Sequence, residues 1–394
     1  MYLFKTKTCV KLQNFILKHK IVLLPFLCVS AVLIILLSSD TKNSQSYPTQ
    51  LTPNEVEPLA YTCCTPLNNS FRTNIFFVKV HKTGSTTVEK VLIRFALMNS
   101  LDVMNIAYHM YHFPFSDWSI YSHTKTPNSK YHILAHHVRY TPAIKSYQYP
   151  DTPTVTLLRH PVTQFQSMYD FFALNQTTGM SLQQFLNAPK KPPFLIGLDS
   201  FLAYRGYNQM SVDLGFDPIQ SKNKIAIDEF IEKLDREFDF VMIMEHMEES
   251  MILLANLMGW PLEKVAYLKI NARLPGSDTY KLTSRDEFTI MDLNEVDTML
   301  YHHFISKFRK CVLQYGEQRM NDQIRRLKKI NEEFARRCIT EDSKSGIWFG
   351  VPKTLEYKPK NSSDLECVYT ITPEIELEDI VRNVQSQRLQ SQKK

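Results

Sequence analysis

The amino-acid sequence predicts an α/β fold in which a central, mainly parallel sheet is flanked by helices. Short apolar runs typical of buried strands alternate along the chain with amphipathic patterns typical of helices. The strand candidates are residues 74–80, 131–136, 153–159 and 238–245, and the helical patterns are residues 84–98, 161–174 and 246–258. Three of the strand candidates end in basic side chains. Because ligands bind beyond the carboxyl ends of parallel strands, these ends predict a binding site.

The N-terminal segment has the charge pattern of a membrane signal-anchor. An uncharged apolar run, residues 21–39, follows a tail that contains five lysines and no acidic residue. As a helix this run would span roughly 28 Å, which is close to the thickness of a bilayer core. The charge excess predicts a cytoplasmic tail at residues 1–20 and a lumenal location for the rest of the chain. A cleaved signal peptide is the alternative, but the run is long for one and no A-x-A site follows it.

Behind the anchor, composition divides the chain into three parts. Residues 40–70 are rich in Ser, Thr, Pro, Asn and Gln and predict a stem. Residues 71–340 predict the globular domain. Residues 341–394 predict a C-terminal extension whose polar end, from Arg388, is disordered.

The helical stretch at residues 284–338 is heavily charged. Its predicted buried stripe is Phe288, Met291, Val296, Met299 and Leu300. Its basic cluster is Arg325, Arg326, Lys328 and Lys329. We expect this cluster to form a solvated helix face, and a contact with an acidic glycan is the alternative. The formal charge of +6 is modest and spread along the chain, which argues against a nucleic-acid-binding surface.

Cysteines and glycosylation sequons fit a lumenal domain. The cysteines that would be lumenal, where disulfides form, are Cys63, Cys64, Cys311, Cys338 and Cys367. Because five is odd, at least one thiol is free or pairs between chains, so a homodimer, disulfide-linked or non-covalent, stays open. The sequons begin at Asn68, Asn175 and Asn361.

The first strand candidate ends in a turn that carries a Gly and several hydroxyl groups, directly before a helical pattern. Main-chain N–H groups at such a turn, the helix dipole, the ammonium of Lys82 and the hydroxyls favour a bound phosphate. The nucleotide-triphosphatase pattern G-x-x-x-x-G-K-[ST] is excluded, because the turn is shorter and Lys82 precedes the Gly. The turn residues are His81, Lys82, Thr83, Gly84, Ser85, Thr86 and Thr87.

A second anion-binding pattern begins at Arg159, at the end of the strand candidate 153–159. Pro161 opens the following helix at its favoured first position, and Ser167 lies two turns further on. The planar guanidinium of Arg159 suits phosphate oxygens, and Ser167 can reach the same group. An ordinary strand–helix corner with a solvent-facing Arg is the alternative when this segment is considered alone.

Together, the two segments resemble the two halves of the site for 3′-phosphoadenosine-5′-phosphosulfate in sulfotransferases. The turn resembles the loop that holds the 5′-phosphosulfate, and Arg159 with Ser167 resembles the element that holds the 3′-phosphate. Residues 70–315 look most like the galactose-3-O-sulfotransferase family, which includes galactosylceramide sulfotransferases. The further matching stretches are residues 136–140, 207–215, 238–245 and 268–273. His160 departs from the pattern, since members of the family carry an Asp there.

This resemblance implies a Golgi sulfotransferase with a P-loop-like fold, anchored as a single-pass type II membrane protein with a lumenal catalytic domain. The implied acceptor is the 3-hydroxyl of a terminal galactose on a glycolipid or glycoprotein glycan, and no obligatory metal is expected. The turn alone also fits heparan-type 2-O- or 6-O-sulfotransferases, whereas residues 207–215 and the pair His136-His137 favour the galactose family.

Sulfuryl transfer requires a base for the attacking sugar hydroxyl and cationic donors for the leaving phosphate. His81 is the first candidate for the base, because it lies beside the anion-binding turn, and Lys82 is the candidate for the leaving group. His136 or His137 is the second candidate base, or a donor to the sugar, and one of the pair can instead be structural. The residues expected on the acceptor side are Asn208, Gln209 and Glu245. Structural roles in turns or caps are their alternative.

Two other classes of protein share this predicted topology. A glycosyltransferase that holds a metal–nucleotide commonly has a D-x-D motif, which the sequence lacks, so a metal-independent glycosyltransferase stays open. The other is a non-catalytic lumenal binding protein that kept the fold. The sequence does not distinguish a lipid-linked from a protein-linked galactoside, because both present the same terminal sugar.

Overall fold

The structure is a computed structural model that describes residues 71–105, 130–189, 206–268, 280–340, 344–348 and 351–391. Contacts divide the chain into residues 1–59 and residues 60–394, and every described residue belongs to the second unit. The predicted cytoplasmic tail, anchor and stem therefore lie outside the described residues. Within the described ranges, no helix combines the length and the apolar character needed to cross a bilayer.

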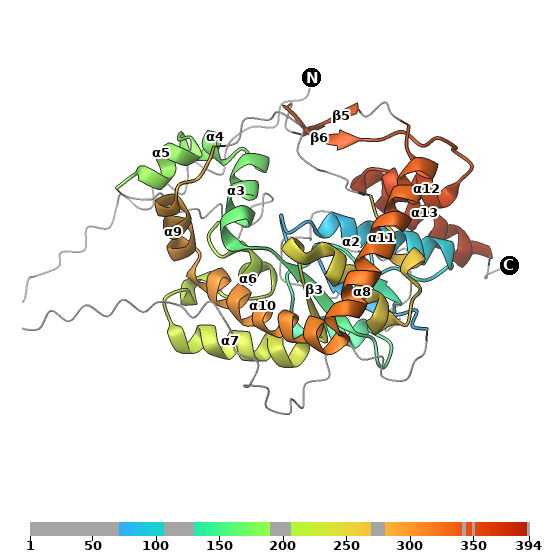
Figure 1. Ribbon diagram of the computed structural model, residues 1–394, viewed down its shortest axis with the longest axis horizontal. Helices are drawn as coiled ribbons and strands as arrows, with labels where there is room; N and C mark the ends of the chain where they lie inside the picture. The colour runs from blue at the N-terminus through green and yellow to red at the C-terminus, as the bar shows by residue number, and fades with distance from the viewer. Residues whose placement is uncertain are drawn as a thin grey trace, which may run out of the picture. The chain divides into compact units, whose positions relative to one another are not determined.

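A four-stranded parallel sheet forms the centre of the domain (Figure 1). Its strands, in the spatial order β2-β1-β3-β4, are β1 (Ile75–Val78), β2 (Ile133–Leu134), β3 (Thr154–Leu158) and β4 (Phe240–Ile243). In the register, Phe77 pairs with Val155. Every residue of the four strands is buried, as expected for a parallel sheet covered by helices. The predicted strands and their parallel arrangement are confirmed.

Helices follow three of the strand ends at the predicted places. They are α2 (Ser85–Met98) after β1, α3 (Pro161–Phe171) after β3 and α8 (Met247–Met258) after β4. The apolar side chains that recur along α2 are all buried: Val88, Val91, Leu92 and Phe95. Between α3 and β4 lie α4 (Leu174–Thr178), α5 (Leu182–Asn187), α6 (Gln209–Asp213) and α7 (Lys224–Glu237).

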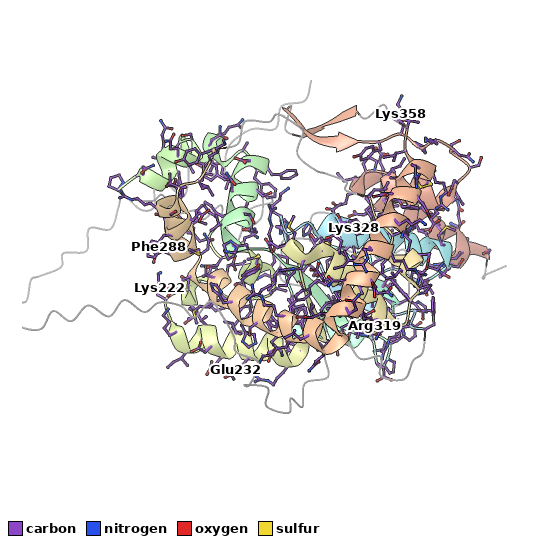
Figure 2. The ribbon with its side chains drawn as sticks, in the orientation of Figure 1. Lys222, Glu232, Phe288, Arg319, Lys328 and Lys358 are labelled. Atoms are coloured by element: carbon purple, nitrogen blue, oxygen red, sulfur yellow. A yellow bond between two sulfur atoms is a disulfide. The ribbon has the colours of Figure 1, made fainter. Side chains whose placement is uncertain are left out.

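The predicted charged helical stretch is confirmed as α9 (Ser284–Leu293), α10 (Glu295–Tyr315) and α11 (Glu317–Cys338). Val296 and Leu300 are fully buried, as predicted, but Phe288 is 69% exposed (Figure 2). In α9 the fully buried apolar residue is Ile290, and Phe288 lies about 200° around the helix from it. The prediction for Phe288 was therefore wrong. The basic cluster on α11 is exposed, as both the predicted solvated face and the alternative of an acidic-glycan contact require.

The C-terminal extension folds as a hairpin and two helices. The hairpin pairs β5 (Lys344–Trp348) with β6 (Val351–Glu356), and α12 (Leu365–Ile371) and α13 (Glu374–Ser391) follow. The expectation of disorder from Arg388 differs from the structure, in which α13 continues to Ser391. Leu377 and Val381 are buried one turn apart, and Arg388 pairs with Asp102 at 3.0 Å. This periodic apolar face explains why the polar helix is ordered.

Candidate active site

The turn after β1 is a compact loop held by its own hydroxyl groups. The hydroxyls of Thr83 and Ser85 donate to the carbonyl oxygen of Val80 at 3.1 and 2.7 Å. Lys82 (φ 60°) and Gly84 (φ 81°) both have left-handed backbone conformations. A Cβ at Gly84 would lie 3.3 Å from Cγ of Met244, so both its φ and its surroundings favour glycine.

The main-chain N–H groups of this turn suit an anion. Within the described residues, no hydrogen bond uses the main-chain N–H of Thr83, Gly84, Ser85 or Thr86. The first N–H groups of a helix have no partner within the helix, and together with the helix dipole they attract negative charge. The hydroxyls of Thr83 and Ser85 thus shape the turn, while its N–H groups are the donors placed for a phosphate.

The two predicted phosphate-binding segments meet at the ends of the adjacent strands β1 and β3. The guanidinium of Arg159 donates to the carbonyl oxygen of Lys82 at 3.2 Å and to the hydroxyl of Thr163 at 2.9 Å. The ammonium of Lys82 lies 3.4 Å from the ring centroid of Phe171. Ser167 is buried on the same helix, α3. The predicted phosphate-binding residues therefore lie at the carboxyl ends of β1 and β3 and in the helices that follow these strands, α2 and α3.

His81 is held by a carboxylate. Its main-chain N–H donates to Oδ2 of Asp213 at 2.8 Å, and its Nδ1 lies 2.7 Å from the same oxygen. Gln209 donates to the other oxygen of Asp213 at 2.9 Å. With Nδ1 bonded to Asp213, Nε2 is the ring nitrogen that can accept a proton. This arrangement, in which a third group orients the base, is the one used in general base catalysis.

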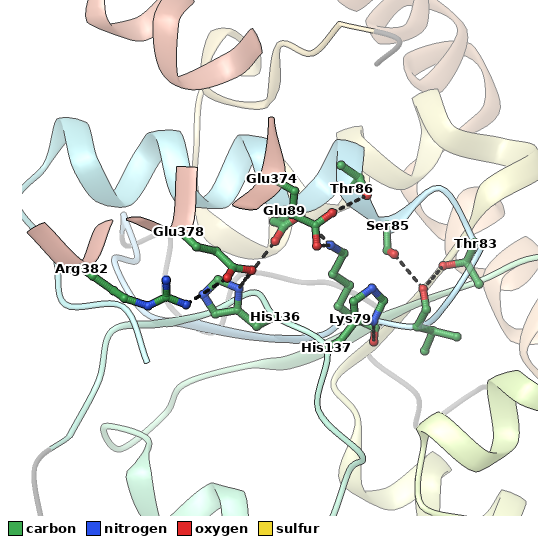
Figure 3. Close-up of polar contacts among 11 residues, drawn as sticks. Lys79, Thr83, Ser85, Thr86, Glu89, His136, His137, Glu374, Glu378 and Arg382 are labelled. Carbon is green, nitrogen blue, oxygen red and sulfur yellow. Dashed lines mark hydrogen bonds and ion pairs between the residues drawn. The ribbon is translucent and has the colours of Figure 1, made fainter. Parts of the chain in front are cut away.

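The two consecutive histidines have different surroundings (Figure 3). The ring of His137 stacks on His81 with centroids 3.9 Å apart, and its Nδ1 lies 3.1 Å from the carbonyl oxygen of Lys79. His136 is 2% exposed, and its Nδ1 lies 3.4 Å from Glu378 and 3.6 Å from Glu89. These contacts bring His137 to the site and favour a structural role for His136.

His136 belongs to a buried cluster of charges. Burial by itself lowers the pKa of His136, but Glu378 and Glu89 outweigh burial and raise that pKa to about 9. Ligand atoms of these three residues lie within 4.8 Å of one another, a spacing that a metal ion could use. However, the second oxygens of the carboxylates pair with Lys79 and Arg382. Because cations already balance both carboxylates, an ion-pair cluster explains the arrangement better than a metal centre.

Asn208 and Gln209, which were predicted to bind the acceptor, form hydrogen bonds with other residues of the protein. Oδ1 of Asn208 accepts from the N–H groups of Val296 and Asp297 at 3.0 and 3.2 Å. Gln209 is 1% exposed and supports Asp213. Asn208 therefore links α6 to the start of α10, and Gln209 contributes to the orientation of His81. These contacts favour the structural alternative, and their binding to a sugar stays a prediction.

Glu245 links the ends of β3 and β4. Its Oε1 accepts from the main-chain N–H of His160 at 2.8 Å, and its Oε2 accepts from the hydroxyl of Tyr301 at 3.2 Å. It thereby fixes the backbone beside Arg159. Burial lowers the pKa of His160, the residue that departs from the family pattern.

Sequence reasoning missed the role of Asp213 and the cluster around Lys79. Asp213 is 132 residues from His81, and only the fold brings the two together. Lys79 looked like a strand residue, yet it is 1% exposed and pairs with Glu89 and Glu374. A lysine inside an apolar strand pattern was the available signal, because a buried lysine requires a carboxylate partner.

A family model and individual relatives of this chain point to the same protein family. The model of the galactose-3-O-sulfotransferase family matches residues 6–348. Human galactose-3-O-sulfotransferase 3 is 30% identical over 296 residues, which cover 71% of this chain and 67% of that protein. Mouse galactosylceramide sulfotransferase is 28% identical over 374 residues, which cover 87% and 86%. These names indicate galactose 3-O-sulfotransferase activity, and the chain belongs to the galactose-3-O-sulfotransferase family.

Proposed function

We propose that this enzyme moves a sulfuryl group from 3′-phosphoadenosine-5′-phosphosulfate to the 3-hydroxyl of a terminal galactose on a glycolipid or glycan. One observation carries the proposal. A histidine oriented by a carboxylate, His81 with Asp213, lies at the end of β1 beside a turn whose N–H groups suit a phosphate. The names of the relatives contain both galactose and galactosylceramide. We place the enzyme in the Golgi membrane, with residues 21–39 as its anchor.

Each part of the donor has a matching group in the structure. The N–H groups of the turn and the ammonium of Lys82 would hold the 5′-phosphosulfate. Arg159 and Ser167 would hold the 3′-phosphate. Arg159 also contacts the turn directly through the carbonyl oxygen of Lys82, so both phosphates would bind to one connected surface. These groups provide the positive charge that stabilises a leaving phosphate.

The proposed reaction is a single in-line displacement. The galactose 3-hydroxyl oxygen forms a bond to sulfur, and the bond from sulfur to the 5′-phosphate oxygen breaks. The hydroxyl proton moves to Nε2 of His81, and Asp213 stabilises the resulting imidazolium. The products are the galactose 3-sulfate and adenosine 3′,5′-bisphosphate, whose new negative charge lies at the turn and Lys82.

A transfer assay tests this proposal. Full-length protein in detergent would be incubated with ³⁵S-labelled donor and with galactosylceramide, a lactose-type glycan or heparan sulfate, followed by linkage analysis. We expect label at the 3-hydroxyl of galactose. Label only on heparan would favour the heparan-type alternative. A parallel incubation with a labelled uridine-nucleotide sugar tests the glycosyltransferase alternative, which transfer of the sugar instead of sulfate would favour. If the protein binds adenosine 3′,5′-bisphosphate but transfers no sulfate, the hypothesis of a non-catalytic lumenal binding protein is favoured.

Substitution of Asp213 tests the proposed base. Asp213→Asn removes the charge that stabilises the imidazolium of His81, so we expect kcat to fall roughly 100-fold or more. The affinity for adenosine 3′,5′-bisphosphate should stay nearly unchanged, because Asp213 is not among the proposed phosphate-binding groups. Asp228→Asn, an exposed change on α7, is the matched control. Near-normal kcat in a folded Asp213→Asn enzyme would exclude the His81–Asp213 pair as the base.

A further inference from the structure

The C-terminal helices are fastened to the helix that begins at the donor turn. The family match ends at residue 348, and α12 and α13 lie beyond it. A disulfide joins Cys338 at the end of α11 to Cys367 in α12. Arg94, buried on α2, donates to Thr370 of α12 at 3.1 Å and to the carbonyl oxygen of Ala266 at 2.7 Å. In Figure 1, α12 and α13 accordingly lie beside α2.

This attachment places Glu374, the first residue of α13, against the donor turn. One carboxylate oxygen of Glu374 pairs with the ammonium of Lys79. The other accepts a hydrogen bond from the hydroxyl of Thr86 at 3.4 Å (Figure 3). Thr86 lies in the first turn of α2, and its N–H is one of the groups placed for the phosphate. Glu374 therefore contacts Lys79, two residues before the turn, and Thr86, within the turn.

The carboxylate of Glu374 helps to stabilise the charged form of the buried Lys79. Burial by itself lowers the pKa of Lys79, but Glu374 and Glu89 outweigh burial and raise the pKa above its usual value. The carboxylate of Glu89, 2.7 Å from Lys79, also faces His136. Without Glu374, the buried ammonium would share one carboxylate with a second cation. Such an incompletely paired buried charge is costly, and the backbone around it would shift or admit water.

The position of Lys79 is transmitted to the catalytic histidine. The carbonyl oxygen of Lys79 lies 3.1 Å from Nδ1 of His137, whose ring stacks on His81. His81, the first residue of the turn, follows Lys79 by two residues. A shift of Lys79 would therefore move the turn that binds the donor, together with the stacked histidines beside it.

We propose that Glu374, supplied by the C-terminal extension, is a positioning residue for the donor turn. Its carboxylate fixes Lys79 before the turn and Thr86 within it, and this holds the N–H groups in the arrangement that binds the 5′-phosphate. The proposal rests on the proposed function, since it concerns the same donor site. It predicts that donor binding requires a residue outside the stretch that the family model matches.

Variants of the full-length enzyme in detergent test this role. Glu374→Ala should raise both the KM for the donor and the Kd for adenosine 3′,5′-bisphosphate by about tenfold, equivalent to about 1.4 kcal/mol. The KM for the galactoside should change less than the KM for the donor, because Glu374 contacts the donor turn directly and reaches the stacked histidines only through Lys79. Glu374→Gln keeps the side-chain size and a hydrogen-bond acceptor, so it should recover part of the loss. Glu376→Ala, an exposed change of the same kind on α13, should behave as wild type.

The outcomes separate this inference from the proposed function. If wild type binds adenosine 3′,5′-bisphosphate and Glu374→Ala binds it equally well, the positioning role is refuted while the donor site stands. A parallel loss in the Glu376→Ala control would also refute it, because the effect would then come from general loss of acidic charge. If Glu374→Ala does not fold, Glu374→Gln decides: a raised Kd supports the role and an unchanged Kd refutes it. Absence of binding by wild type would overturn both proposals.

Discussion

At the scale of single residues, the surroundings of a side chain decide what it does. His136 and His137 both follow β2, but His136 stands at a bend, whereas His137 forms a parallel bridge with Lys79. The ring of His137 stacks on His81, and His136 enters the buried cluster with Glu89 and Glu378. Two residues that look equivalent in the sequence thus belong to different environments, one beside the proposed base and one in the core.

The charge on His136 should make stability depend on pH. Its pKa is raised from 6.5 to about 9 in the folded protein. The protonated form is therefore favoured by folding, so the stabilisation is fully present below pH 6.5 and is lost as the pH rises through 9. The shift corresponds to at most about 3 kcal/mol. Denaturant unfolding should therefore show that, below pH 6.5, the free energy of unfolding of His136→Gln is much lower than that of wild type.

That difference in the free energy of unfolding should narrow above pH 9, because the wild-type imidazole has then lost its proton. His302→Gln, an exposed change on α10, provides the control and should follow wild type throughout. A His136→Gln variant whose unfolding free energy differs from wild type by the same amount at every pH would show that shape, and not charge, is what His136 contributes.

At the scale of elements, local patterns predicted the strands, the helices and the turn well. The apolar runs gave the positions of β1, β3 and β4, and the Gly before Ser85 marked the start of α2. The positions of these elements depend on residues that are neighbours in the sequence, so a single sequence is enough to predict them. The predictions for Phe288 and Arg388 failed because each depends on which side of a helix meets the rest of the protein.

Long-range pairs could not be predicted from local patterns. His81 meets Asp213 across 132 residues, and Lys79 meets Glu374 across 295. Nothing near Lys79 in the sequence specifies which of the many carboxylates will neutralise it. The type of partner could be predicted from the cost of burying a charge, whereas its identity follows from the packing of α13 on α2.

The disulfide between α11 and α12 should hold the C-terminal helices in place. It closes a loop with a sequence separation of 29 residues, for which chain entropy gives about 3–4 kcal/mol. The double substitution Cys338→Ser with Cys367→Ser should lower stability and increase hydrogen exchange across α12 and α13. Amides further along α2 should also exchange faster, since Arg94 of α2 donates to Thr370 of α12. Unchanged exchange in α13 would mean that Arg94 and the apolar contacts suffice without the disulfide.

At the scale of the whole molecule, the predicted membrane topology and the proposed function both place the catalytic domain in the lumen. The proposed acceptor and donor require a lumenal catalytic domain, and the lysine-rich N-terminus predicts one. Two sequons of the described domain are accessible to solvent: Asn175 lies on α4 and Asn361 precedes α12, and both are exposed. A lumenal domain would expose both to glycosylation, whereas a cytosolic domain would leave both unmodified.

Glycosylation of the full-length protein in animal cells therefore reports its topology. We expect an endoglycosidase that removes N-linked glycans to increase the mobility of the protein, and Asn175→Gln and Asn361→Gln each to remove one step of that change. Asn187→Gln, at an exposed asparagine outside any sequon, should have no effect. A folded, membrane-bound protein that lacks glycans at both sites would place the domain on the cytosolic side. That result would contradict the proposed Golgi location while leaving the donor site intact, because the geometry around His81 does not depend on the membrane.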